Sequence, residues 1–297
     1  MPNIERSAAV VGAAGFIGRA LTEALRVRGI PVTGYTRAAP FVDESGRLSA
    51  GIREVDTVFW LASSIRPATV SGQAVAAADE NALSRLLDGL RSGGQPNVRM
   101  VAVSSGGTVY DPTSPSPHGE SAPLAPANDY GAAMLRIESL IRSSVPDPVV
   151  LRVSNAYGPG QPARRGQGVI AYWLSAIADH QPIHVLGPDD VARDYVFIDD
   201  VVAALVCVHV ADDVPPVVNI GSGVPTTLGQ LVDAVRDTVA PRTVELRHDD
   251  RRSFDAPSTW LDVSVAAAEL GWKPATDLAT GLRRTWAHLS AHREPGK

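Results

Sequence analysis

A glycine-rich turn near the N-terminus is the first segment whose residues could bind a ligand. Gly12, Gly15 and Gly18 stand three residues apart, between an apolar run and a helical pattern. In such a turn the first glycine permits a tight bend, the second lets the backbone approach a pyrophosphate, and the third allows the helix to pack closely. The helix N-terminus, at Phe16 and Ile17, offers free amides and partial positive charge to phosphate. The turn therefore predicts a dinucleotide-binding site.

The residues that follow the second apolar run indicate which dinucleotide is bound. An NAD site usually has an acidic residue about 20 residues beyond the glycines, where it binds the ribose 2′-hydroxyl. This chain has no carboxylate between Glu23 and Asp43, and it has Thr36 and Arg37 instead. A hydroxyl and a guanidinium suit a 2′-phosphate, which a carboxylate would repel. NADP(H) is therefore the expected cofactor.

The elements that must position these residues follow from the apolar pattern. Strands are expected at residues 7–11, 31–35, 57–62, 98–104, 149–153 and 217–220. Helices are expected after the glycine turn and at 81–90, 130–143, 169–179, 199–211, 228–239 and 264–270. Strands that alternate with helices predict an α/β fold, with a Rossmann-type doubly wound parallel sheet and a smaller C-terminal substrate lobe.

The expected domain division assigns residues 1–158 and 193–222 to the NADP-binding Rossmann domain. Residues 159–192 and 223–297 are assigned to the substrate-binding lobe. Residues 111–129 hold five prolines and are expected to form a loop over the carboxyl edge of the sheet. Ligands bind at that edge in open α/β folds.

Composition argues against several other classes of protein. The 297 residues carry a net charge of −5, which disfavours a nucleic-acid partner. No apolar run reaches the roughly 18 residues that a membrane helix needs, and the N-terminus lacks a signal-peptide pattern, so we expect a cytoplasmic protein without a membrane partner. The single cysteine, Cys207, is expected to be a core thiol. The assembly is left open, with a homodimer as one outcome.

Two residue types narrow the chemistry further. Lys273 and Lys297 are the only lysines, so reactions that need a lysine within the first 272 residues are excluded. His288 and His292 have a helical spacing, but a third ligand is missing, so we expect a solvated tail and no metal site.

Eight segments of the chain, taken in order, resemble the landmarks of the extended short-chain dehydrogenase/reductases, in the branch of nucleotide-sugar epimerases, dehydratases and ketoreductases. They are residues 12–18, 59–62, 104–110, 130–131, 151–159, 193–201, 219–221 and 270–274. The resemblance extends from residue 7 to about residue 286. It implies the Rossmann fold and implies that Leu61 and Ala62 line the cofactor site.

The resemblance also implies a catalytic triad of Ser or Thr, Tyr and Lys, in which the tyrosine exchanges a proton with the substrate and the lysine lowers the pKa of the phenol. Tyr130 matches the tyrosine, but the lysine position is Met134 and the serine position aligns with Gly106. Ser104, Ser105 and Thr108 are the nearby hydroxyls. Thr108 is the preferred candidate to orient a substrate carbonyl beside Tyr130, because it lies two residues from the lost position, and Ser105 is the next candidate. Without the lysine, Tyr130 should keep a high pKa and remain a proton donor, which favours reduction over oxidation.

On the substrate side, the resemblance implies that an Asn after the fifth strand and arginines of the C-terminal lobe bind a nucleotide diphosphate. Asn155, Arg193 and Arg252 stand at these positions. Guanidinium groups suit diphosphate oxygens because they can form paired hydrogen bonds.

These observations favour an NADPH-dependent ketoreductase that acts on the carbonyl of a nucleotide-linked keto-deoxysugar. Three alternatives stay open. They are a ketoreductase of an aromatic or polyketide natural product, in which the substrate or the solvent supplies the proton, a nucleotide-sugar 4-epimerase, and a catalytically silent NADP-binding sensor.

Overall fold

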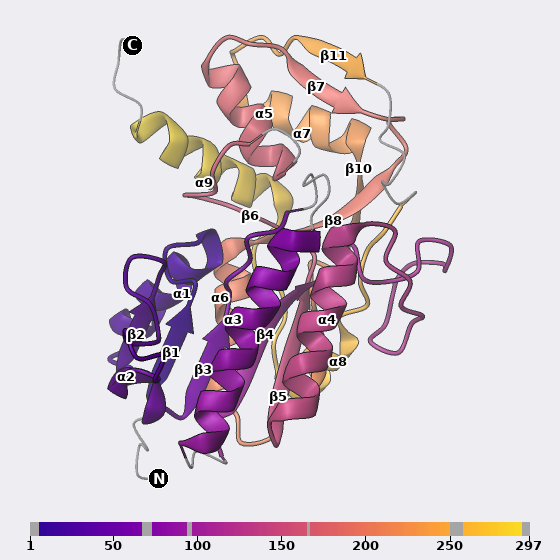
Figure 1. The fold of residues 1–297 in the computed structure, drawn as a ribbon. Coiled ribbons are helices and arrows are strands. Elements are labelled where there is room, and N and C mark those ends of the chain that lie inside the picture. The colour runs from indigo at the N-terminus through magenta and orange to yellow at the C-terminus, as the bar shows by residue number, and fades with distance from the viewer. Residues whose placement is uncertain (1–5, 67–72, 94–96, 165–166, 250–257, 293–297) are drawn as a thin grey trace.

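The computed structural model describes residues 6–66, 73–93, 97–164, 167–249 and 258–292. Helices cover both faces of a central sheet, and a smaller group of elements lies over one edge of that sheet (Figure 1). We call this smaller group the second lobe.

The central sheet has six strands in the order β2-β1-β3-β4-β5-β9, and each neighbouring pair is parallel. The strands are β1 (Ala8–Val11), β2 (Val32–Tyr35), β3 (Thr57–Trp60), β4 (Arg99–Ser105), β5 (Asp147–Val153) and β9 (Val217–Ile220). This arrangement confirms the predicted Rossmann-type fold. The strand order changes direction between β1 and β3, and ligands of open α/β sheets bind in the crevice beyond such a point.

Alternate residues of β1 enter two different apolar cores, as expected for a sheet that is covered on both faces. Ala8 and Val10 belong to the core with α1 and α6, whereas Ala9 and Val11 belong to the core with α2, α3 and α4. The helices are α1 (Phe16–Val27), α2 (Ala50–Arg53), α3 (Gln73–Ser92), α4 (Asp129–Ser144) and α6 (Ile198–Val210). Helix α8 (Ser264–Glu269) contacts β9.

The second lobe contains two small sheets and three helices. Its strands are β6 (Asn155–Tyr157), β7 (Ile183–Leu186), β8 (Ala192–Phe197), β10 (Pro225–Thr227) and β11 (Leu246–Asp249). Its helices are α5 (Val169–Ala178), α7 (Leu228–Val239) and α9 (Leu278–Ala291). Buried Trp173, Leu231 and Leu282 belong to the same core cluster as α1 and α6, so the lobe and the sheet share one apolar core.

The structure adds elements that the apolar pattern did not predict. Strands β6, β7, β8, β10 and β11 have three to six residues each, too few for a clear period. Helix α3 begins eight residues before the expected position 81, at Gln73. The proposed division of the chain into two domains stays a prediction, although β8 pairs with β6 and β10 of the second lobe.

The expected solvated tail at the C-terminus is a helix in the structure, although His292 is exposed to solvent as expected. His288 lies on α9, and His292 caps its end. Leu282 is fully buried on this helix, which packs against α5 and α7. The pattern is weak because only Gly281, Leu282 and Thr285 of α9 are buried, which gives a narrow stripe with one large apolar side chain. Among the described residues, no helix is both long and apolar enough to cross a bilayer.

Two buried histidines make the stability of this fold depend on pH. His118 is 2% exposed and stacks on the ring of Tyr110, and His209 is 1% exposed. Burial lowers the pKa of both imidazoles below 6.5. The unfolded chain therefore binds these protons at a higher pH than the folded chain does, so stability falls as the pH drops below the unfolded value of about 6.5.

We expect the substitution His118→Phe to reduce this loss of stability, since phenylalanine keeps a stacking ring and cannot be protonated. Between about pH 7.5 and about pH 5.5, the free energy of unfolding of the variant should fall less steeply than that of the parent, by at most about 1.4 kcal/mol per pH unit. Urea denaturation at several pH values measures this slope. The same substitution at exposed His248 is the control, and equal slopes for parent and His118→Phe would contradict the prediction.

Candidate active site

A cavity of about 700 Å³ lies between the carboxyl edge of the central sheet and the second lobe. One wall comes from the start of α1, the ends of β3 and β4, and the start of α4. The opposite wall comes from β6, α5, β7, β8 and the end of β11. The cavity therefore joins the predicted cofactor turn to the predicted substrate residues.

The glycine turn has the backbone geometry of a phosphate site. Gly12 has φ +97°, and a Cβ there would come within 2.7 Å of the amide nitrogen of Ala62. Helix α1 begins at Phe16 without a side-chain cap, so its first amides have no capping oxygen. Gly15, Phe16, Ile17 and Gly18 line the cavity. This uncapped, glycine-lined helix start fits the pyrophosphate of a dinucleotide.

Leu61 and Ala62 continue from β3 and line the same wall as the glycine turn. The Leu61 amide donates to the Val11 carbonyl at 2.8 Å, which holds the end of β3 beside the end of β1. The structure thus brings together two of the cofactor segments that the sequence proposed.

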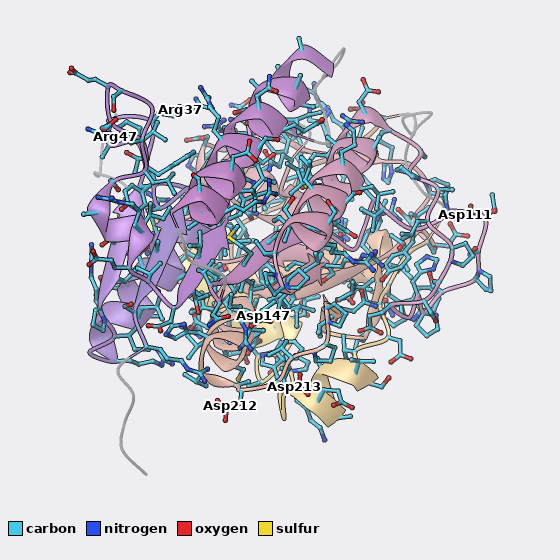
Figure 2. All side chains as sticks on the ribbon, turned by 60° about the horizontal axis from the view of Figure 1, so that its bottom comes forward. Arg37, Arg47, Asp111, Asp147, Asp212 and Asp213 are labelled. Carbon is cyan, nitrogen blue, oxygen red and sulfur yellow. The ribbon has the colours of Figure 1, made fainter. Side chains whose placement is uncertain are left out.

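Thr36 and Arg37 do not line the cavity but follow β2 at its margin. The Tyr35 carbonyl accepts from the amides of Gly12 and Ala13 at 2.9 and 3.0 Å, so the end of β2 adjoins the glycine turn. Arg37 is exposed at the surface (Figure 2), and it donates to the Ser64 hydroxyl at 2.9 Å. Its place beside the turn keeps it as a candidate for the 2′-phosphate end of a cofactor.

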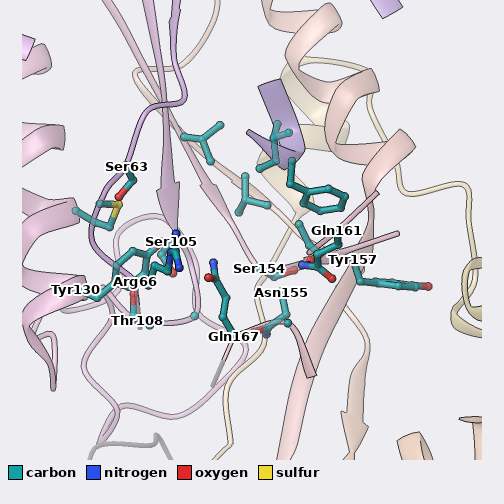
Figure 3. A pocket seen from close by; sticks show the side chains of 18 of the residues that line it. Ser63, Arg66, Ser105, Thr108, Tyr130, Ser154, Asn155, Tyr157, Gln161 and Gln167 are labelled. Carbon is teal, nitrogen blue, oxygen red and sulfur yellow. The ribbon is translucent and has the colours of Figure 1, made fainter. Parts of the chain in front are cut away.

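Tyr130 lies in the first turn of α4, next to Ser105 at the end of β4. The Asn128 side chain caps the helix by accepting from the Gly131 amide at 2.8 Å. Burial raises the pKa of the Tyr130 hydroxyl above 10, and a hydrogen bond with Ser105 only partly opposes this. Tyr130, Ser105 and Thr108 all line the cavity, on one side of the view in Figure 3.

The structure corrects the position of the serine. The resemblance places the serine position at Gly106, which does not line the cavity. A Cβ on Gly106 would lie 2.6 Å from Leu261 Cδ1 and 3.1 Å from the Arg152 carbonyl oxygen. Ser105 is the serine beside Tyr130. Gly106 lies in the turn after β4, and Leu261 from a distant segment occupies the space beside it, so Ser105 at the end of the strand is the residue that reaches the cavity.

Met134 occupies the position one helical turn after Tyr130, where the resemblance implies a lysine. Its side chain is 5% exposed and lines the cavity. A thioether offers no positive charge to the phenol, so nothing at this position stabilises a phenolate. The geometry therefore pairs a serine with a protonated tyrosine.

A buried ion pair, which the sequence reading missed, holds α4 against β5. Arg152 Nη2 lies 2.7 Å from Glu138 Oε2, and both side chains are at most 3% exposed. The Ser104 hydroxyl donates to Glu138 Oε1 at 2.5 Å, and Arg152 also donates to the Tyr110 hydroxyl at 3.2 Å. A glutamate two turns after Tyr130 on the buried face of the helix was the signal that could have revealed it.

On the opposite wall, two of the three proposed substrate residues line the cavity. Asn155 on β6 donates from Nδ2 to the Asp194 carbonyl at 2.9 Å, and Arg193 on β8 donates to the Ala192 carbonyl at 2.8 Å. Arg252 lies outside the described residues. The buried Asp194 carboxylate accepts from the amide and hydroxyl of Ser222, both at 2.7 Å, and so joins β8 to the loop after β9.

Buried polar atoms without partners gather around this cavity. Within the described part of the chain, four buried side-chain nitrogen or oxygen atoms have no hydrogen-bond partner. Three of them belong to residues that line the cavity, namely Trp60 Nε1, Thr108 Oγ1 and Gln161 Oε1. Buried polar groups are normally paired, so these atoms indicate that a polar ligand completes the site.

Comparison with known proteins agrees with this geometry. Residues 8–221 match the model of the NAD dependent epimerase/dehydratase family. The dTDP-4-dehydro-6-deoxyglucose reductase of Escherichia coli is 34% identical over 188 residues, which cover 62% of this chain and only 59% of that enzyme.

Two further relatives match nearly the whole chain. The dTDP-6-deoxy-L-talose 4-dehydrogenase (NAD(P)(+)) of Kitasatospora kifunensis is 30% identical and covers 95% of both chains. The crystal structure of the UDP-glucose 4-epimerase of Thermotoga maritima with UDP-glucose has a TM-score of 0.82 at 26% identity, and it covers 96% of this chain and 99% of its own. This chain thus has the fold of enzymes that act on nucleotide sugars.

We expect Tyr130 to stay protonated at every pH below about 10, because burial opposes the phenolate and the uncharged Met134 stands at the lysine position. The substitution Met134→Lys should lower the pKa of Tyr130 by about one to three pH units, since an opposite charge would then lie one helical turn away. The ultraviolet absorbance of the phenolate, taken as the difference between each protein and its Tyr130→Phe counterpart, measures this pKa. Met134→Leu is the matched control, and a parent Tyr130 that ionises below pH 10 would contradict the prediction.

Proposed function

Because this chain belongs to the NAD dependent epimerase/dehydratase family, we propose that it is an NADPH-dependent ketoreductase that reduces the carbonyl of a nucleotide-linked keto-deoxysugar. The observation that carries this proposal is the half-buried Tyr130 beside Ser105, with the pKa of its hydroxyl raised by desolvation and with Met134 in place of a lysine. The names of the Escherichia coli and Kitasatospora relatives support a keto-deoxysugar as the substrate class.

The cofactor would be held by the glycine turn and by the ends of β2 and β3. The uncapped start of α1 receives the pyrophosphate, and Leu61 and Ala62 line the same wall. Thr36 and Arg37 face the adenosine end, where a guanidinium favours a 2′-phosphate. When bound, NADPH supplies the hydride that reduces the carbonyl carbon.

Tyr130 supplies the proton. As the carbonyl oxygen gains negative charge, the phenolic O–H donates its proton to that oxygen, and the product is an alcohol. The Ser105 hydroxyl forms a hydrogen bond with Tyr130 and can orient the same carbonyl oxygen. The Thr108 hydroxyl is buried without a partner among the described residues, and it is the second donor for that oxygen. These two hydroxyls hold the carbonyl in place for hydride transfer.

The direction of the reaction follows from the same environment. Oxidation of an alcohol needs a group that takes a proton at neutral pH, and a phenol whose pKa burial has raised does this poorly. A 4-epimerase begins with such an oxidation. The epimerase relatives keep this activity as the second candidate, and Met134 weighs against it.

The nucleotide diphosphate would lie against the second lobe. Asn155 and Arg193 line the wall opposite Tyr130, and Arg252 is the third proposed contact. A guanidinium and an amide on the wall opposite the glycine turn would provide a second phosphate site, separate from that of the cofactor.

NADPH consumption with a panel of nucleotide-linked ketosugars and aromatic ketones tests the proposal. We expect oxidation of NADPH with ketosugars and a loss of about 10²- to 10⁴-fold in kcat for Tyr130→Phe, because general acid catalysis is worth that much. Interconversion of UDP-glucose and UDP-galactose without net consumption would establish the epimerase instead. Turnover of aromatic ketones alone would favour the polyketide alternative, and no turnover with tight NADPH binding would favour the sensor.

We also expect NADPH to bind more tightly than NADH, and Arg37→Asp to reduce or reverse this preference. Loss of a charge-assisted hydrogen bond to a phosphate costs about 1.5 to 3 kcal/mol, or about 10- to 150-fold in Kd. Fluorescence titration with both cofactors measures the two affinities. Arg47→Asp, an exposed arginine farther along the same loop, is the control, and equal affinities of the parent for both cofactors would refute the NADP assignment.

A further inference from the structure

The wall opposite Tyr130 contains a glutamine whose acceptor oxygen is unused. Gln161 lines the cavity, and its Oε1 is buried without a hydrogen-bond partner. Figure 3 shows Gln161 with Ser154 and Asn155 across the cavity from Tyr130 and Ser105. A buried carbonyl-type oxygen that lacks a donor is costly unless a ligand or water supplies one.

The orientation of this amide is set by its other end. Gln161 Nε2 donates to the Ala156 carbonyl at 2.8 Å. A carbonyl can only accept, so the nitrogen must face Ala156 and the oxygen must face away from it. The unpartnered atom of this cavity-lining residue is therefore an acceptor, which selects a donor such as a hydroxyl and repels a phosphate oxygen.

The backbone around Gln161 holds the side chain in place. Its amide donates to the Gly158 carbonyl at 3.2 Å, and the preceding Gly160 carbonyl accepts from Arg19 Nη2 at 2.8 Å. Arg19 belongs to the first turns of α1, so the loop that carries Gln161 is tied to the cofactor-binding helix. The side-chain amide of Gln161 also packs on Gly168, where an added Cβ would lie 3.0 Å from Gln161 Nε2 and 3.1 Å from Oε1.

We propose that Gln161 is a specificity-determining residue whose Oε1 accepts a hydrogen bond from a hydroxyl of the substrate sugar. This inference rests on the proposed function, because it needs a sugar between Tyr130 and the second lobe. The same acceptor could bind a ribose hydroxyl of the cofactor. We assign the sugar because Gln161 lies on the wall that also presents Asn155 and Arg193.

Two substitutions separate a sugar contact from a structural role. Gln161→Met keeps the volume but removes both the donor and the acceptor. Gln161→Glu keeps an acceptor oxygen and, once ionised, cannot donate to the Ala156 carbonyl. Gln181→Met is the control, since Gln181 Nε2 also donates to a backbone carbonyl, that of Asp179, but Gln181 does not line the cavity.

Calorimetric titration of the full chain provides the test. The ligands are dTDP-glucose, UDP-glucose, the nucleoside diphosphates dTDP and UDP, and NADPH. We expect Gln161→Met to raise the Kd of the nucleotide sugar by about 3- to 10-fold, as for one lost hydrogen bond, and to leave the Kd of the nucleoside diphosphate and of NADPH within about 2-fold. Gln161→Glu should keep most of the affinity for the nucleotide sugar, and Gln181→Met should match the parent.

The other outcomes overturn the inference in distinguishable ways. A parent that binds neither nucleotide sugar would overturn the proposed function and this assignment with it. A parent that binds them, with unchanged affinity in Gln161→Met, would overturn only the role of Gln161. Equal weakening of all ligands in both variants would show a structural role, and weakening of NADPH alone would place the contact on the cofactor.

Discussion

The position of Tyr130 depends on the buried ion pair between Glu138 and Arg152. Removing two charges from water is costly, and here each charge also forms hydrogen bonds with neighbouring groups, including the Ser104 and Tyr110 hydroxyls. The ion pair thus fixes the rotation of α4 about its own axis and its position along β5. Because a helix is rigid over two turns, the direction in which Tyr130 enters the cavity follows from this pair.

The same polar network reaches the loop between β4 and α4 and the last strand of the sheet. The Tyr110 hydroxyl donates to Asn219 Oδ1 at 2.6 Å, and the Asn219 amide donates to Glu120 Oε1 at 2.8 Å. Asn219 also donates to the His118 carbonyl at 2.9 Å. Hydrogen bonds therefore connect β5, β9 and the loop between β4 and α4 into one network beside the cavity. A change at any of these polar groups leaves another buried group without its partner.

The chemistry of the cavity is set by what α4 presents one turn after Tyr130. A lysine there would stabilise the phenolate and allow the tyrosine to take a proton as well as to give one. Met134 instead adds apolar surface next to a hydroxyl whose pKa is already raised by burial. Met134 therefore leaves the phenol without the positive charge that a lysine at this position would provide.

The order of apolar runs and the glycine turn were enough to predict the parallel sheet and most of its helices, and they pointed to the turn that lines one end of the cavity. These features are local, because a period of two or 3.6 residues and the conformations of glycine are properties of short segments. The tertiary structure alone decided that Ser105 rather than Gly106 meets Tyr130, because Leu261 from a distant segment fills the space beside Gly106. It also decided that Gln161 lines the cavity with its Oε1 buried and without a partner. Which side chains share a cavity depends on contacts between segments far apart in the chain, and no local period records those contacts.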